Sequence, residues 1–223
     1  MLKGDFHIHS KYSFDSLLSL KTIIITAKKR GLDIIAVTDH NTIKGTKEAR
    51  MWGKEFGIEV IIGAEILTDV GDITGLFITE DITSRDWEDT IDNIHDQGGL
   101  VVLPHPFRGH ENIKEVAERV DLIEVFNSRS TPKENKKAER LAEKLKKKVI
   151  VGSDAHSAKE IGFANICFDG ENLSKTLVLN GNRKILSGVY TSNYYKIKSY
   201  LIRMLKLKEY SKLQHYLKSL VRK

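Results

Sequence analysis

The sequence is poor in the residues that make disulfides, thiolate metal sites and membrane spans. Its 223 residues include one cysteine, Cys167, which excludes an intrachain disulfide and a cysteine-rich zinc cluster. Any bound metal would therefore be held by imidazole and carboxylate groups. No apolar stretch approaches the roughly 20 residues of a transmembrane helix, and the first residues lack the three regions of a signal peptide. We expect a cytoplasmic protein without a transmembrane segment.

Acidic residues are almost missing from the C-terminal end of the chain. Residues 190–223 contain nine Lys or Arg and one acid, Glu209, which gives a net charge of +8. Residues 1–189 contain the other 27 Lys or Arg and 29 Asp or Glu, which gives a net charge of −2. Leu201 and Leu205 fall at helical spacing, which predicts a helix with an apolar stripe. We expect a domain over 1–189 and a basic helical tail over 190–223. The tail could pack on the domain or on another subunit, or contact nucleic acid or an anionic membrane.

Short runs rich in Val, Ile and Leu alternate with longer amphipathic stretches through most of the chain. This pattern is typical of buried parallel strands alternating with helices, and seven or eight such units favour a closed or distorted barrel. Ser19 and Ser84 are expected to cap two of the helices. The expected strands are 5–9, 33–38, 58–65, 73–78, 100–103, 121–126, 148–152 and 164–168.

Potential metal ligands stand at the end of one strand after another. The runs finish in "FHIH", "AVTDH", "VIIGAE", "VVLPH" and "VIVGSDAH". His7 and His9 point to the same side of an extended strand, so both imidazoles can reach one ion. The ends of barrel strands converge on one face, where active sites are assembled. Each motif alone is weak, but five coincidences at strand ends predict one shared metal site.

The predicted ligand set favours one class of chemistry. Neutral imidazole and carboxylate groups bind Zn, Mn or Fe, and a carboxylate can bridge two ions. Clustered divalent ions activate water and neutralise charge on a phosphoryl group. The sequence has no Gly-rich phosphate loop and no serine nucleophile motif that would compete with this interpretation. Hydrolysis of a phosphate ester is therefore favoured over redox chemistry.

The elements "HIH", "TDHN", "GAE", "HP" and "SDAH", in that order over residues 4–168, resemble the PHP family, named for polymerase and histidinol phosphatase. The resemblance implies a distorted (β/α)7 barrel, two or three metal ions and phosphoesterase activity. It also implies three ligand sets: His7, His9, Glu65 and Asp154 at one ion; Glu65 as a bridge to a second ion with His105; and Asp15, His40 and His156 at the third.

One departure from the family pattern concerns the second ion. Members often carry a histidine in the strand after the bridging glutamate, where this chain reads "TDVGDITGLF". Asp72 is the favoured substitute, with Asp69 as the nearby alternative, because a carboxylate can replace imidazole as a ligand.

Several neighbouring residues are further candidates. Asp39 is predicted to orient a histidine, or else to cap a helix. Arg108 and Arg129 are candidates for gripping a phosphate, and Asn127 for contacting the substrate. Glu124 is a weaker candidate ligand. The remaining histidines are expected to lie outside the site: His110 and His215 exposed to solvent, and His95 near the end of a helix.

The sequence therefore predicts a metal-dependent phosphoesterase that acts on a phosphorylated small molecule or nucleotide, with Arg108 orienting the ester. One alternative is a phosphodiesterase or exonuclease acting on nucleic acid, with the tail enlarging its footprint. The other is a metal-binding regulatory module without catalysis. Metal ligands indicate a reaction class, whereas specificity depends on loops.

Overall fold

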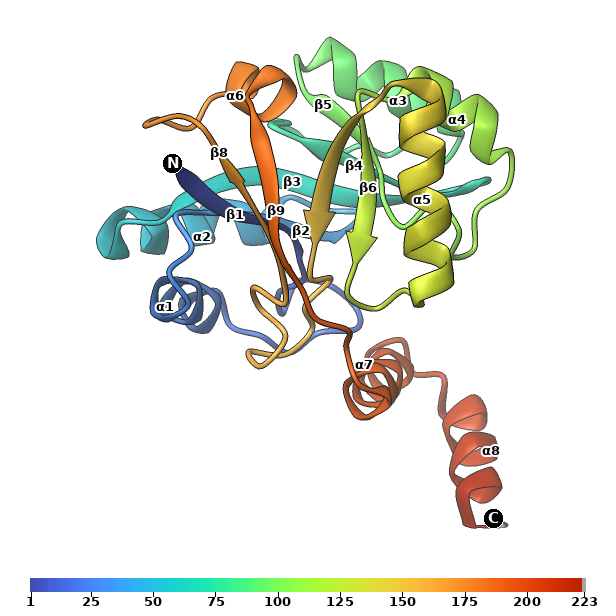
Figure 1. The fold of residues 1–223 in the computed structure, drawn as a ribbon. Helices are drawn as coiled ribbons and strands as arrows, with labels where there is room; N and C mark the ends of the chain where they lie inside the picture. Colours follow the sequence, from blue (N-terminus) through green and yellow to red (C-terminus); the bar gives the residue numbers. More distant parts are fainter. Residues whose placement is uncertain (222–223) are drawn as a thin grey trace.

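A computed structural model describes residues 1–221 and shows an α/β fold built on one nine-stranded sheet (Figure 1). The strands are β1 Leu2–Ile8, β2 Ile34–His40, β3 Glu59–Thr68, β4 Gly71–Leu76, β5 Leu100–Leu103, β6 Leu122–Asn127, β7 Lys148–Gly152, β8 Ala164–Phe168 and β9 Arg183–Gly188. The helices are α1 Leu20–Lys29, α2 Lys44–Phe56, α3 Trp87–Asp96, α4 Ile113–Arg119, α5 Pro132–Leu145, α6 Lys175–Asn180, α7 Asn193–Lys206 and α8 Tyr210–Val221.

The first seven strands follow one another around a nearly closed barrel, which confirms the predicted distorted (β/α)7 barrel. The sheet order is β7-β6-β5-β4-β3-β2-β1-β8-β9. The two ends of the seven-strand series meet just beyond β7, where Ala155 forms a parallel bridge with Ile8. The His9 amide donates to the Ala155 carbonyl at 2.9 Å. This closure brings the end of β1 beside the end of β7.

The alternation of strands and helices implied a parallel sheet, but the observed sheet is mixed. β4 runs antiparallel to both β3 and β5, and β8 is antiparallel to β1 and β9. Only Asp69 and Val70 separate β3 from β4. So short a connection permits only an antiparallel pair, since a parallel partner needs a long crossover. β9, which sequence patterns did not indicate, extends the sheet beyond the barrel.

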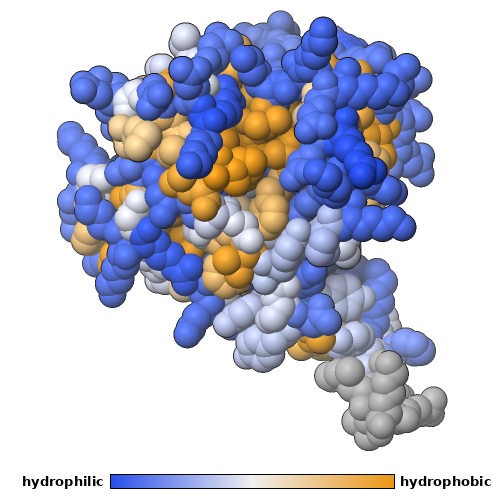
Figure 2. Space-filling view, in the orientation of Figure 1, coloured by the Kyte–Doolittle hydropathy of each residue, from blue (hydrophilic) through white to orange (hydrophobic). Residues whose placement is uncertain are grey.

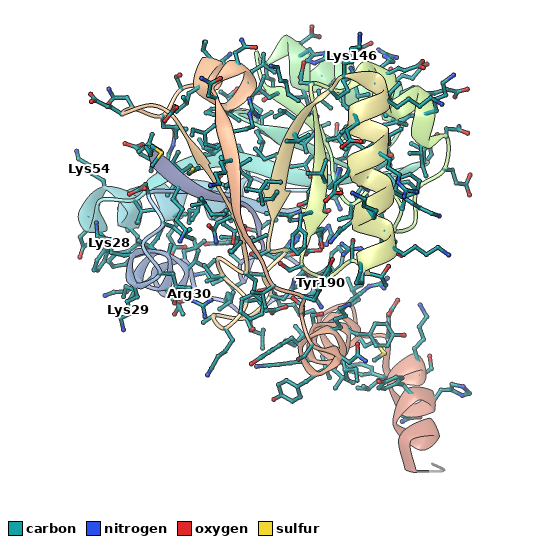
Figure 3. The ribbon with its side chains drawn as sticks, in the orientation of Figure 1. Lys28, Lys29, Arg30, Lys54, Lys146 and Tyr190 are labelled. Carbon is teal, nitrogen blue, oxygen red and sulfur yellow. The ribbon has the colours of Figure 1, made fainter. Side chains whose placement is uncertain are left out.

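Helix ends follow local sequence, with one correction. Ser19 caps α1 by accepting a hydrogen bond from the Thr22 amide, as predicted. α3 is capped by Asp86, whose side chain accepts from the Asp89 amide, and not by Ser84. Ser84 instead accepts from the Asp86 amide. The basic residues Lys28 and Lys29, labelled in Figure 3, stand in the last turn of α1, where they complement the helix dipole.

α7 lies beneath the ends of β6 and β7, while α8 extends away from the barrel (Figure 1). The buried residues of α7 are Ser199, Ile202 and Met204. The predicted stripe is therefore displaced, because Leu205 is 53% exposed. No helix within residues 1–221 is long and apolar enough to span a membrane. The division of the chain at residue 189 stays a prediction.

The apolar core occupies both sides of the sheet, and some apolar surface stays uncovered. α1 and α2 pack Ile23, Ile24 and Ala49 against Ile35 and Val37 of β2. Figure 2 shows an apolar area on the face that carries β9. Two of the exposed apolar residues of β9 are Ile185 and Leu186.

Candidate metal centre

The predicted ligands converge at one end of the barrel. Their side chains form four overlapping groups whose ligand atoms lie within 4.8 Å of one another. The groups are His9, Asp15, His40 and His156; His7, His9 and Glu65; His7, His105 and Asp154; and Glu65, Asp72 and His105. Every residue of the predicted set of nine is included, from six strand ends and the loop after β1.

His7 and His9 project together, as the strand alternation predicts. Their Nε2 atoms are 3.1 Å apart. Glu65 Oε2 lies 3.3 Å from His7 Nε2 and 3.4 Å from His9 Nε2, and Asp154 Oδ1 lies 3.3 Å from His9 Nε2. His7, His9 and Glu65 form one of the four groups, whereas Asp154 is grouped with His7 and His105.

Asp15 lies on the other side of His9, with two further histidines. Its Oδ2 is 2.8 Å from His156 Nε2 and 3.4 Å from His40 Nε2. The Phe14 ring stacks on His40 with centroids 4.3 Å apart. His9 stands between the two halves of the cluster, so it is a member of this group as well.

Glu65 reaches the third part of the cluster through its other oxygen. His105 Nε2 is 2.9 Å from Glu65 Oε1, and Asp72 Oδ2 lies 3.9 Å from the same nitrogen. Asp69 instead accepts a hydrogen bond from the Trp87 amide. The geometry therefore favours Asp72 over Asp69 as the substitute for the family's histidine.

The backbone is held in unusual conformations at two of these positions. His105 has φ +29° and Asp154 has φ +52°, both positive values that L residues rarely adopt. Such strain is typical of functional sites. Gly152 is needed nearby, because a Cβ there would lie 2.2 Å from His7 Cβ and 2.4 Å from Glu124 Oε1.

Glu124 and Asn127 support the cluster from behind. Glu124 Oε1 lies 3.1 Å from His7 Nδ1, so the ring donates there and leaves Nε2 free for an ion. Glu124 Oε2 accepts from the His105 amide and from Asn127 Nδ2. Asn127 is completely buried. Its predicted contact with the substrate is therefore not supported, and its interactions position the residues around it.

Asp39 also differs from its predicted role of orienting a histidine. Its two oxygens accept hydrogen bonds from the amide and the hydroxyl of Ser10, both at 2.6 Å. The Asp39 side chain lies on the opposite face of β2 from the His40 side chain, because the side chains of successive strand residues point to alternate faces. It therefore fixes the loop after β1 that carries Asp15. A direct catalytic role for Asp39 has no support in this geometry.

Seven of the nine predicted ligands, all except the buried His7 and His9, line a pocket of about 310 Å³ together with three arginines, Arg108, Arg129 and Arg203. Arg108 Nη2 lies 2.5 Å from Asp154 Oδ2, and Nη1 donates to Asn127 Oδ1 at 3.0 Å. Arg129 Nη2 donates to Ser199 Oγ of α7. The two predicted phosphate-binding arginines therefore both reach the pocket, Arg108 beside a proposed ligand and Arg129 against α7.

α7 is fastened to the loop that carries Asp15. Lys206 Nζ donates to the carbonyls of Lys11 and Ser13 at 2.7 Å and of Ser16 at 2.8 Å. Arg203 lies over the Phe14 ring at 5.7 Å. The basic segment thus forms part of the pocket wall.

The sequence model of the PHP domain matches residues 5–220. The chain belongs to the PHP family. It is 34% identical over 215 residues to an uncharacterized protein of Methanocaldococcus jannaschii, covering 91% of this chain and 86% of that one. A 67-residue stretch, 30% of this chain, is 43% identical to a 5'-3' exoribonuclease of Haemophilus influenzae, of which it spans 24%.

The PHP fold is also seen in solved structures. A two-domain protein from Bacteroides vulgatus, described as containing a predicted PHP-like metal-dependent phosphoesterase, superposes with a TM-score of 0.64 and 20% identity. The match covers 74% of this chain and 57% of that one. At this identity the likeness shows the fold alone.

The residues of this PHP domain fit divalent cations. Four carboxylates, those of Asp15, Glu65, Asp72 and Asp154, are gathered in one largely buried cluster. Buried Asp72 Oδ1 and the Nδ1 atoms of His40 and His105 have no hydrogen-bond partner among the described residues. Such crowding of buried anions and orphaned polar atoms is costly unless cations compensate it.

Electrostatics agree with this fit at His9, Glu65 and Asp154. Burial would lower the pKa of His40, but Glu65 and Asp15 outweigh it and raise that pKa to about 9, so this imidazole must lose a proton to bind an ion. Burial and the neighbouring His156 lower the pKa of His9 to about 4, which keeps its imidazole neutral and able to bind a metal. Burial would raise the pKa of Glu65, but His7 and His40 outweigh it and hold that pKa well below its usual range. Asp154 is likewise kept ionised, because Arg108 and His7 outweigh its burial and lower its pKa.

His110 was expected in solvent, and the structure contradicts that. Its Nε2 donates to the Asp72 carbonyl at 2.8 Å, and its ring centroid is 5.5 Å from that of His105. Burial, with the charge of His105, lowers the pKa of His110 to about 4. The imidazole therefore stays neutral and holds the strand that carries Asp72. His95 and His215 lie away from the pocket, His95 beside Asp121 and His215 exposed on α8.

Sequence reasoning missed the contribution of α7. Ser199 and Arg203 line the pocket, yet they belong to a segment whose composition indicates only a basic helix. Their four-residue spacing places them on one helix face, but nothing in the sequence shows which surface that face meets.

Proposed function

We propose that this protein is a metal-dependent phosphoesterase that hydrolyses a small phosphate ester. The observation that carries the proposal is one pocket that is lined by three arginines and by members of all four groups of potential metal ligands. Carboxylate and imidazole clusters suit divalent transition metals, and arginine matches the geometry of phosphate oxygens. A single pocket therefore offers both components that phosphate ester hydrolysis requires.

The centre is proposed to hold two or three ions of Zn, Mn or Fe. His7, His9, Glu65 and Asp154 would hold one; Glu65, Asp72 and His105 a second; and Asp15, His40 and His156 a third. Bound ions supply Lewis acidity, which activates water and offsets phosphoryl charge. Glu124 orients His7 for this role by accepting a hydrogen bond from Nδ1. His156 is oriented in the same way, because its Nδ1 donates to the Asp154 carbonyl at 2.8 Å.

Arg108 is proposed to orient the ester. Its guanidinium bonds to Asp154 at the edge of the cluster, and the same carboxylate is a proposed ligand. When Asp154 is engaged by a metal, Arg108 can direct its donors to a phosphoryl oxygen instead. Orientation next to an activated water lowers the barrier by removing the cost of assembling the reactants.

The size of the pocket favours a small ester over nucleic acid. Its volume of about 310 Å³ lies at the lower end of the range for small-ligand sites, about 300–1,000 Å³. α7 forms one wall through Ser199 and Arg203. The exonuclease alternative is supported by the similarity to an exoribonuclease over 67 residues, and it stays a prediction, as does the regulatory module.

The proposal is tested with purified protein reconstituted with Mn²⁺ or Zn²⁺. Turnover is measured on phosphomonoesters, nucleoside bisphosphates and short oligonucleotides, and bound metal by elemental analysis. His7→Ala/His9→Ala should lose bound metal and lower turnover by at least about 100-fold, because it removes first-ion ligands. The matched control His215→Ala changes an exposed histidine on α8 and should retain both.

Each contrary outcome has a separate meaning. Equal turnover in the wild type and in His7→Ala/His9→Ala would refute the mechanism. Absence of transition metal after reconstitution would refute the metal centre. Bound metal without turnover of any ester would favour the regulatory module, and turnover restricted to oligonucleotides would favour the exonuclease.

A further inference from the structure

The pocket has two parts: the ligand end, lined by the proposed metal ligands, and the arginine end, lined by Arg129 and Arg203. Arg129, from the loop after β6, lines this end of the pocket. Ser199 and Arg203 of α7 line it as well. Ser199 and Arg203 are four residues apart, so they lie on the same helix face. Ser199 Oγ accepts from Arg129 Nη2 and donates to the Lys196 carbonyl at 3.0 Å. The side chains of Arg129, Ser199 and Arg203, called the polar wall below, all line the pocket.

The two guanidinium groups of the polar wall are incompletely hydrogen-bonded, and that of Arg129 is paired with a buried carboxylate. The Arg129 side chain is 9% exposed, yet its Nη1 has no hydrogen-bond partner within the described residues. The nearest acid, Glu160, lies 3.6 Å from Nη1, and its Oε1 is also without a hydrogen bond. Arg203 Nε is a third such buried atom. Buried donors of this kind are costly unless a ligand or water satisfies them.

Positive charge exceeds negative charge at this end. Burial, together with the charges of Arg129 and Arg108, lowers the pKa of Lys196, which shows how closely the cations are gathered. Asp154 faces Arg108, but the proposed function assigns that carboxylate to a metal. Glu160 then balances the charge of Arg129, and Arg203 and the nearby Lys196 supply the excess positive charge.

We propose that Arg129, Ser199 and Arg203 form a subsite for a second anionic group of the substrate, either a carboxylate or a second phosphate. The inference rests on the proposed function, which places the scissile phosphate at the ligand end. Arginine and hydroxyl donors match carboxylate and phosphate oxygens. A substrate with two anionic groups would therefore span the pocket. Ser199 and Arg203 of α7 would favour it over an ester with one anionic group.

Two pairs of esters test this subsite. Glycerol 3-phosphate and 3-phosphoglycerate differ by a carboxylate, and fructose 6-phosphate and fructose 1,6-bisphosphate differ by a second phosphate. With Mn²⁺-loaded protein, the doubly anionic member of at least one pair should show a kcat/KM about tenfold higher, because a charge-assisted hydrogen bond contributes that much discrimination. The pair that shows the preference identifies which second anion is recognised.

Variants on α7 then locate the effect. Arg203→Gln should lower the preference ratio about tenfold, chiefly through KM. Ser199→Ala removes only a hydroxyl and should lower the ratio by a smaller factor, which keeps the test valid if Arg203→Gln folds poorly. Lys198→Gln removes the same charge from an exposed position on the same helix and should leave the ratio unchanged.

Binding separates this inference from the proposed function. Calorimetry with the same four esters gives Kd values that do not depend on turnover. Tighter binding of a doubly anionic ester without hydrolysis would overturn the proposed function and leave the subsite standing. The subsite is overturned if the wild type prefers neither doubly anionic ester, or if Arg203→Gln and Ser199→Ala both retain the preference of Lys198→Gln.

Discussion

Replacing Lys206 with Met tests whether α7 holds the loop that carries Asp15. The Lys206 ammonium donates to three carbonyls of that loop, at 2.7, 2.7 and 2.8 Å. A hydrogen bond to a charged group contributes about 1.5–3 kcal/mol. Water can reach part of this exposed side of α7 and replace some of the lost bonds. We therefore expect Lys206→Met to lose about 2 kcal/mol in total, less than the sum of three bonds.

The assay combines stability with metal retention. Urea unfolding of the EDTA-treated protein measures the free energy of unfolding, and competition with a chelator measures metal affinity. Because the loop carries Asp15, Lys206→Met should also weaken the affinity of at least one ion about tenfold. Lys198→Met, an exposed position on the same helix, is the matched control. Agreement of the two variants within about 0.5 kcal/mol and in metal affinity would refute the reasoning.

Two further predictions concern residues behind the cluster. Glu124→Gln should weaken metal binding about 10- to 100-fold, because it replaces the carboxylate that orients His7. Chelator competition measures the metal affinity, with the exposed Glu118→Gln as the control. Equal metal affinity in the two variants would contradict the prediction. The pKa of His110 is lowered from 6.5 to about 4, so the unfolded state takes up the proton first as pH falls, and the native state loses stability below about pH 6.5. Urea unfolding of the metal-free protein measures the free energy of unfolding of the wild type and of His110→Gln. The difference between them should shrink by about 2 kcal/mol from about pH 7 to pH 5. A difference that stays constant over this range would show that His110 does not titrate this way.

Local sequence was enough to predict the barrel and most of the ligand cluster. Apolar runs such as Leu100–Leu103 have the composition of buried strands, and they coincide with observed strands. Parallel barrel strands place their ends on one face. The strand-end positions of His40 and Glu65 therefore predicted a common site, and the structure brings these residues together.

Supporting roles could not be predicted, because they depend on side-chain direction across elements. Asn127 was expected at the substrate, but it lies behind the cluster between Glu124 and Arg108. Asp39 meets Ser10 instead of a histidine. His110 comes from a loop whose path sequence does not define. A hydrogen bond between distant residues depends on the packed arrangement of strands and loops, which local patterns do not contain.

The sequence by itself was enough to select the proposed metal ligands, because ligand chemistry and strand periodicity are local properties of residues such as His7 and His9. Tertiary structure alone decided what the basic segment does. The charge and spacing of α7 fit several partners equally well, whereas the packed chain places Arg203 in the pocket and Lys206 on the loop after β1. The docking of a helix depends on the shape and hydrogen-bonding groups of the surface that receives it, and that surface exists only once the barrel has formed.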